Sequence, residues 1–141
     1  MINFDRQYIS KTYPSIIDGD GWSFIIDDGW IAHVNNITDN IMGWITKFNS
    51  DYNENVTLKI LQIKEKFGGL RYYYTLDGYD DMSETHFNEF DKLRTHISEF
   101  VHQMEVSTYH ICELCGMYGE ITKINRGWLK TLCLFHKTQY Q

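Results

Sequence analysis

The chain has 141 residues, of which 43% are hydrophobic and 16% aromatic, and this composition excludes a disordered or fibrous protein. Its formal net charge of −6 disfavours general binding to duplex DNA, which requires clustered Lys and Arg. The charge is uneven: residues 59–74 hold four basic residues and one acid, whereas residues 77–91 hold six acids and no Lys or Arg. An anionic ligand is therefore expected to meet the first of these stretches.

The N-terminal third predicts two helices separated by a loop. Residues 3–12 form a short helix that ends before Pro14, because proline cannot continue a helix. Asp-Gly turn signals then predict a folded-back loop over residues 15–29. Apolar residues recur at steps of three and four between positions 30 and 48, which predicts an amphipathic helix with Asp28 or the preceding Asp as its N-cap.

A β-hairpin and a second helix are predicted in the middle of the chain. Residues 56–63 and 70–76 are rich in β-branched, aliphatic and aromatic side chains, and they flank the adjacent glycines Gly68 and Gly69. Ile60 and Leu61 are adjacent and both apolar, so the pairing register of the two strands is left open. Either a β-bulge or burial on both faces of the strand would explain them. Between residues 87 and 104 the apolar spacing again indicates an amphipathic helix.

The last third of the chain carries a metal-ligand pattern. Cys112-x2-Cys115 is followed by seventeen residues and then by Cys133-x2-His136. A two-residue gap lets both side chains of a knuckle reach one tetrahedral ion. The gap of seventeen exceeds the roughly twelve residues of a DNA-reading C2H2 finger, and it suits two knuckles joined by a hairpin over residues 120–132. The pattern predicts one Zn²⁺ per chain.

Two alternatives remain open at this site. His110 precedes the first knuckle and competes with His136 for the fourth ligand position. Three buried cysteines that hold no metal are the other interpretation, since free cysteine often packs as a small hydrophobic residue. If four protein side chains bind the ion, no position is left for water or substrate, so we expect the zinc to be structural and not catalytic.

Together these elements predict an α+β fold. Two main helices would pack on a small antiparallel sheet, and a zinc ribbon or treble-clef module would follow. We assign residues 1–106 to an α+β domain that contains the hairpin, and residues 107–141 to the structural zinc module.

Cysteine usage and hydropathy bear on the compartment. The three cysteines are an odd number and all lie between positions 112 and 133, and no apolar leader or run of 18 apolar residues is present. We therefore expect a protein of the cytoplasm, without a membrane partner.

Three separate motifs give the chain a resemblance to a small family of uncharacterised phage and bacterial proteins. Those proteins carry an Asp-Gly-Trp motif before a helix, a VKEKFGGLRFY-like hairpin and a CExCGxxG…GWxxTLC zinc element. Here the matching stretches are Asp28-Gly29-Trp30, residues 62–73, residues 112–119 and residues 127–133. The resemblance spans about residues 22–136, and it implies this architecture and a phage origin, hence the cytoplasm of a host cell, but no established activity. At His136 the family has either Cys or His.

The hairpin is also the predicted ligand site. Basic side chains flank a Gly-Gly tip whose backbone N–H groups can approach phosphate closely, and nearby aromatic rings offer stacking faces for a base. The alternative is a tight hairpin with solvated lysines and buried tyrosines. The predicted ligand residues are Lys64, Lys66, Gly68, Gly69, Arg71, Tyr73 and Trp30.

Three functions are compatible with these features. The first is a non-enzymatic binding protein that sequesters an anionic, nucleotide-like ligand, as phage counter-defence sponges do. The second is an interaction or inhibitor protein that docks on a host protein through its acidic helix and zinc module, and the third is a nucleic-acid-binding zinc ribbon. No P-loop, nucleophile elbow or G-x-G-x-x-G motif is present, so we do not expect an enzyme, although scattered acids and histidines leave a hydrolase as an alternative. A homo-oligomer is compatible with all three.

Overall fold

The hairpin predicted in the middle of the chain forms the centre of the fold. In the computed structural model, which describes residues 2–17 and 23–140, strand β2 (Thr57–Lys66) pairs antiparallel with β3 (Gly69–Asp77). The pairing shifts between Ile60 and Gln62, so the residue between them is extra. Of the two explanations that the sequence left open, the structure therefore has the bulge. The bulge keeps the buried residues on either side of it on one face of the sheet.

A third strand makes the sheet mixed. Strand β1 (Ser23–Ile25) gives the order β1-β2-β3 and runs parallel to β2. The prediction of a purely antiparallel sheet is therefore corrected. Three residues are too few to show an alternating pattern, which is why the sequence predicts only a loop here. The sequence Asp-Gly-Trp also occurs at residues 20–22, which lie outside the described residues.

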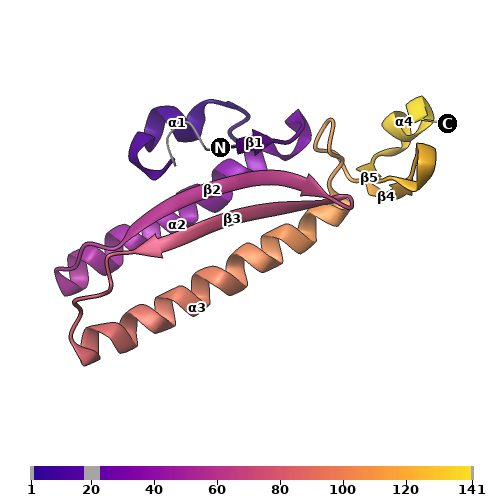
Figure 1. Ribbon diagram of the computed structural model, residues 1–141. Helices are drawn as coiled ribbons and strands as arrows, with labels where there is room; N and C mark the ends of the chain where they lie inside the picture. Colours follow the sequence, from indigo (N-terminus) through magenta and orange to yellow (C-terminus); the bar gives the residue numbers. More distant parts are fainter. Residues whose placement is uncertain (1, 18–22, 141) are drawn as a thin grey trace.

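Two long helices, α2 (Ile31–Tyr52) and α3 (Glu84–Ser107), pack against the buried face of the hairpin (Figure 1). The predicted Asp cap of α2 is wrong, because the helix follows the 3-10 turn η3 (Asp28–Trp30) and has no side-chain cap. The core between helices and sheet is apolar, and its fully buried members include Val34, Ile37, Ile41, Ile60, Ile63, Leu70, Phe90 and Ile97.

Side chains at the end of α3 cover the free edge of β3. The Glu105 carboxylate accepts a hydrogen bond from the backbone N–H of Tyr72 at 2.8 Å. The Thr108 hydroxyl, in the 3-10 turn η4 (Thr108–His110), accepts one from the N–H of Leu70 at 3.0 Å. These bonds satisfy edge amides that would otherwise be open to pairing with another chain.

Short segments complete both ends of the chain. Helix α1 (Tyr8–Thr12) and the turn η1 (Pro14–Ile16) each bury one isoleucine against the core. After α3 the chain forms a small module at the tip of the hairpin (Figure 1). Its elements are β4 (Glu120–Lys123), η5 (Asn125–Gly127), β5 (Leu129–Leu132), α4 (Leu134–Lys137) and η6 (Thr138–Tyr140).

The architecture has the predicted α+β class, with the C-terminal module in its expected place. The predicted boundary between residues 106 and 107 falls in the last turn of α3, and its assignment as a domain boundary stays a prediction. None of the helices within residues 2–17 and 23–140 combines the length and the apolar character needed to cross a membrane.

Candidate metal centre and the adjoining cleft

Four side chains of the C-terminal module converge on one point. The ligand atoms of Cys112, Cys115, Cys133 and His136 all lie within 4.8 Å of one another. The Sγ atoms of Cys115 and Cys133 are 3.7 Å apart, and His136 Nδ1 lies 3.3 Å from Cys133 Sγ. A disulfide would bring two sulfurs to about 2.05 Å, whereas tetrahedral Zn–S bonds of about 2.3 Å place them roughly 3.8 Å apart. The cluster therefore fits a metal such as zinc and contains no disulfide.

The structure places His136, and not His110, among the candidate ligands. His136 Nδ1 also lies 3.6 Å from Cys112 Sγ. The His110 ring instead stacks on Tyr118, with ring centroids 6.1 Å apart, and within the described ranges it belongs to no such cluster. Of the two alternatives for the fourth position, the geometry favours His136.

The first knuckle depends on the backbone freedom of Gly116. This residue has a φ of 80°, in the left-handed region that favours glycine. Its N–H donates to the carbonyl oxygen of Cys112 at 2.9 Å, which closes the turn around the cysteines. Cys112 is buried whereas Cys115 is exposed, so an ion held here would lie near the surface of the module.

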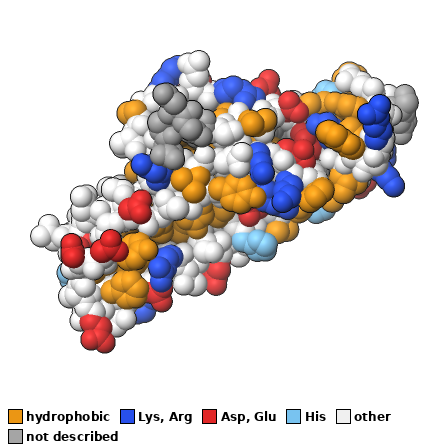
Figure 2. Space-filling view, in the orientation of Figure 1, with side chains coloured by type: hydrophobic (Ala, Val, Ile, Leu, Met, Phe, Trp, Pro, Cys, Tyr) orange, Lys and Arg blue, Asp and Glu red, His pale blue; other side chains and the backbone are white. Residues whose placement is uncertain are grey.

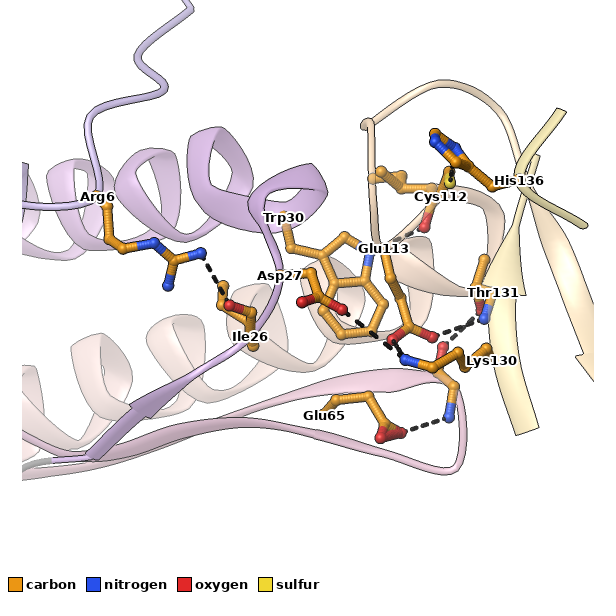
Figure 3. Close-up of polar contacts among 12 residues, drawn as sticks. Arg6, Ile26, Asp27, Trp30, Glu65, Cys112, Glu113, Lys130, Thr131 and His136 are labelled. Atoms are coloured by element: carbon orange, nitrogen blue, oxygen red, sulfur yellow. Dashed lines mark hydrogen bonds and ion pairs between the residues drawn. The ribbon is translucent and has the colours of Figure 1, made fainter. Parts of the chain in front are cut away.

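The motif Asp28-Gly29-Trp30 joins the body of the fold to this knuckle (Figure 3). The N–H of Gly29 donates to the carbonyl oxygen of Glu113 at 2.8 Å, and a Cβ on Gly29 would lie 2.6 Å from the same oxygen. Trp30 is 1% exposed, and its indole Nε1 donates to the carbonyl oxygen of Ile111 at 2.8 Å. Trp30 therefore anchors the joint, and its predicted use as a stacking face for a ligand is corrected.

A buried ion pair lies at the same joint (Figure 3). The Glu113 side chain is 2% exposed; its carboxylate accepts a hydrogen bond from the N–H of Thr131 at 2.7 Å and lies 3.4 Å from Lys130 Nζ. The ammonium of Lys130 also lies 3.8 Å from Asp27. Burial raises the pKa of the Glu113 carboxyl, and its bonds to Thr131 and Lys130 offset part of that rise. The pair ties the knuckle to β5 and to the segment before α2.

The glycine pair at the hairpin tip is buried and its backbone is engaged. The N–H of Gly68 donates to Glu65 Oε2 at 2.9 Å, and its carbonyl oxygen accepts from the Thr131 hydroxyl at 2.6 Å. A Cβ on Gly69 would lie 2.6 Å from the ring of Tyr109. The expectation of an open Gly68-Gly69 backbone that forms an anion nest is therefore wrong, because the tip packs against the module.

The remaining predicted ligand residues do share one face of the hairpin. Lys64 pairs with Arg71 across the strands, and Lys66 lies two residues from Lys64. Lys64 Nζ lies 5.7 Å from the centroid of the Tyr73 ring, and Arg71 donates to the Tyr109 hydroxyl at 3.4 Å. Figure 2 shows Lys and Arg side chains gathered over the part of the hairpin nearest its tip. We call this surface the outer face.

A cleft of about 520 Å³ opens between the hairpin tip and the η5–β5 turn of the module. It is lined by Glu65, Phe67, Gly127, Trp128 and Leu129. Phe67 is 65% exposed and Trp128 is 70% exposed, so two large apolar rings face solvent at one place. Exposed apolar surface of this kind commonly marks a binding site.

Both turns that border the cleft hold a bulky residue in a left-handed conformation. Phe67 has a φ of 55° and Arg126 a φ of 62°, and each precedes a glycine whose φ is also positive. This conformation costs a non-glycine residue roughly 1–2 kcal/mol, and Asn, Asp or Gly is usual at the first position of a two-residue hairpin turn. An exposed Phe here stabilises neither the turn nor the core.

Three cations lie next to residues that line the cleft, and we call these three its rim. Lys66 Nζ lies 5.7 Å from the centroid of the Phe67 ring, and Lys123 Cε lies 3.4 Å from where a Cβ on Gly127 would be. Arg126 directly precedes Gly127. In the part of the chain that the structure describes, none of these three cations forms an ion pair. Glu65 is the acidic residue among those that line the cleft.

Sequence reasoning did not identify Phe67 and Trp128 as site residues. A signal for Phe67 was available, because a Phe directly before Gly-Gly stands where a turn residue is usual. No such signal exists for Trp128, since an aromatic residue in a short hairpin is equally typical of a core. The buried ion pair of Glu113 could likewise not be predicted, because a Glu between two cysteines is expected to be a solvated charge.

Neither protein-family models, nor characterised proteins, nor solved structures show a match to this chain.

Proposed function

We propose that this protein is a non-enzymatic binding protein that captures a planar, anionic, nucleotide-like ligand in the cleft between Phe67 and Trp128. One structural Zn²⁺ per chain, bound by Cys112, Cys115, Cys133 and His136, would hold the module that forms one wall. Four protein ligands leave no open position on the ion, so its contribution is to folding. The order of knuckle, hairpin and short helix fits a treble clef.

The exposure of the two aromatic rings carries this proposal. Phe67 and Trp128 are 65% and 70% exposed, and Phe67 keeps an unfavourable backbone conformation as well. Features that cost stability tend to persist where function requires them. Two aromatic rings beside a hollow offer stacking faces to a base, and stacking of this kind contributes about 1–3 kcal/mol per base.

The charges around the cleft favour an anion. Lys66, Lys123 and Arg126 outnumber Glu65 there, in a chain whose formal net charge is −6. A small cationic rim suits one or two phosphates, whereas duplex DNA would meet the negative charge of the rest of the chain. Capture without turnover agrees with the role of a counter-defence sponge, which the resemblance to phage proteins also supports.

Lys66 belongs to both the cleft rim and the outer face. Lys64, Arg71 and Tyr73 lie on that face next to it. A ligand longer than a mononucleotide, such as a cyclic dinucleotide, would extend from the cleft onto these side chains. Their predicted contact with ligand therefore stays part of the proposal, as a second and outer subsite.

A second candidate function is docking on a host protein. A separate hollow of about 480 Å³ lies on the module beside the metal ligands, and the exposed apolar side chains that line it are Met117, Tyr118, Leu134 and Phe135. Aromatic residues and Met are enriched in protein interfaces. This surface is distinct from the cleft, so the two functions are separable by mutation.

Calorimetric titration with linear and cyclic nucleotides tests the proposal. We expect Trp128→Ala to weaken binding by about 5- to 150-fold, the loss of one stacking contact, with zinc content and secondary structure unchanged. Phe135→Ala is the matched control, because this ring is equally exposed at 70% but lines the other hollow. If no nucleotide binds, the proposal fails and docking on a protein is favoured.

A further inference from the structure

Glu65 lies on the wall between two hollows. It lines the aromatic cleft, and it also lines an adjoining hollow of about 340 Å³ whose other lining residues include Asp27, Glu113 and Lys130. Glu65, the acidic residue among the described residues that line the cleft, therefore stands on the side of the cleft that adjoins this second hollow. A ligand that fills the cleft shares its lining with this carboxylate.

The Glu65 carboxylate is held in a fixed position. Its Oε2 accepts the 2.9 Å hydrogen bond from the N–H of Gly68, and the carbonyl oxygen of Gly68 is fixed in turn by the Thr131 hydroxyl. Gly68 has a φ of 83°, so the turn that presents this N–H is itself specific. Oε1 has no hydrogen-bond partner among the described residues and stays available to a ligand. A carboxylate anchored in this way is preorganised as an acceptor.

The charge on either side of Glu65 orients the ligand. The ammonium of Lys130 is paired with Glu113 and Asp27, so the adjoining hollow, where Glu65 is a third carboxylate, keeps a surplus of negative charge. The cations Lys66, Lys123 and Arg126 lie at the rim. Phosphate is therefore directed toward these cations, and the edge of the base toward Glu65.

A carboxylate in the lining of the cleft selects bases by their hydrogen-bond donors. An ionised carboxylate only accepts hydrogen bonds, so a ring nitrogen or carbonyl oxygen opposite it is repelled. Adenine and cytosine each present one amino group beside an acceptor nitrogen, and uracil presents one N–H between two carbonyls. Guanine presents N1–H and the 2-amino group side by side. Enzymes that read an unstacked base use this same edge together with aromatic stacking.

We propose that Glu65 makes the cleft selective for guanine nucleotides. This inference rests on the proposed function, because it assumes that a base enters the cleft, and it adds the identity of that base and the residue that reads it. Inosine monophosphate, which lacks the 2-amino group of guanine, should bind with intermediate affinity. Uridine monophosphate should bind weakly.

The test compares GMP, IMP, AMP and UMP by calorimetry on the zinc-loaded full chain and on Glu65→Gln. Gln retains an oxygen for the N–H of Gly68, so the turn is preserved, but it also offers an amino group that clashes with the donors of guanine. We expect the unmodified chain to prefer GMP over UMP by about tenfold or more, the loss of one hydrogen bond to a charged group. Glu65→Gln should lose that preference, whereas Glu120→Gln, at an exposed position on β4, should keep it.

The outcomes separate this inference from the proposed function. Equal binding of all four nucleotides overturns guanine selectivity and leaves the cleft as a nucleotide site. A preference for GMP that persists in Glu65→Gln, shown to be folded by circular dichroism, overturns the assignment to Glu65. If none of the four nucleotides binds but a cyclic nucleotide does, the inference fails and the proposed function stands. If no linear or cyclic nucleotide binds, both fail.

Discussion

The hydroxyl of Thr131 donates a 2.6 Å hydrogen bond to the carbonyl oxygen of Gly68, and this bond joins the metal-binding module to the hairpin tip. Thr131 is buried and lies two residues before Cys133, so the position of a candidate metal ligand is coupled to one wall of the cleft. On the other side of the knuckle Gly29 packs against Glu113. Residues 28–30, the hairpin tip and the two parts of the metal-binding module thus meet at one joint.

Removal of the metal should unfold the C-terminal module and leave the rest of the fold intact. We expect one equivalent of zinc per chain and, after a strong chelator, rapid hydrogen exchange over residues 107–138 while α2 and α3 stay protected. The reason is that zinc binding in small modules is worth about 10–16 kcal/mol of folding free energy. Cys112→Ser should show the same exchange pattern without a chelator. Zinc content below about half an equivalent in carefully reduced protein would contradict the metal assignment.

Substitution of each candidate histidine should identify the fourth ligand. His136→Ala is expected to weaken zinc binding strongly, because its Nδ1 lies 3.3 Å from Cys133 Sγ. His110→Ala should leave the affinity for zinc unchanged, since that ring stacks on Tyr118. Competition with a chromophoric chelator measures both affinities. The reverse order of effects would move the ligand role to His110.

A side chain at Gly29 should destabilise the joint. In Gly29→Ala the new Cβ would lie 2.6 Å from the carbonyl oxygen of Glu113, and neither backbone can shift without losing the hydrogen bond between them. We expect a loss of more than about 2 kcal/mol in the free energy of unfolding, measured by urea denaturation.

Gly43 provides the matched control. It lies within α2, and a Cβ there meets no atom within 4 Å. Gly43→Ala should therefore stabilise the protein by about 0.5–1 kcal/mol, the difference in helix propensity. If Gly29→Ala is as stable as the unmodified chain, the packing of this motif against the knuckle is not what holds the joint.

The long elements of the fold could be predicted because each repeats a pattern over many residues. Helix α2 spans about six turns of apolar spacing. The adjacent apolar residues Ile60 and Leu61 indicated an irregularity in β2, but they did not decide between a bulge and burial on both faces. Strand β1 could not be predicted, since three residues carry no periodicity and its pairing depends on a partner far along the chain. Local sequence carries no record of such long-range contacts.

The candidate site was predictable only where spacing encodes it. The two-residue gaps at Cys112 and Cys133 specify a knuckle by themselves. The environments of Trp30 and Gly68 depend instead on how the module packs on the hairpin. This packing buries the Trp30 ring and places the Gly68 backbone in hydrogen bonds, although the sequence predicted that both would be accessible. The cleft between Phe67 and Trp128 arises from that same docking, so it has no motif of its own.

Photo-crosslinking with an azido-guanine nucleotide tests the central claim most directly. A ligand whose base lies between the two rings should form adducts with Phe67 or Trp128, identified by tandem mass spectrometry of peptides, and excess GMP should suppress them. Adducts confined to the outer face, at Lys64, Arg71 or Tyr73, or to the hollow beside Phe135, would contradict the placement of the ligand in the cleft.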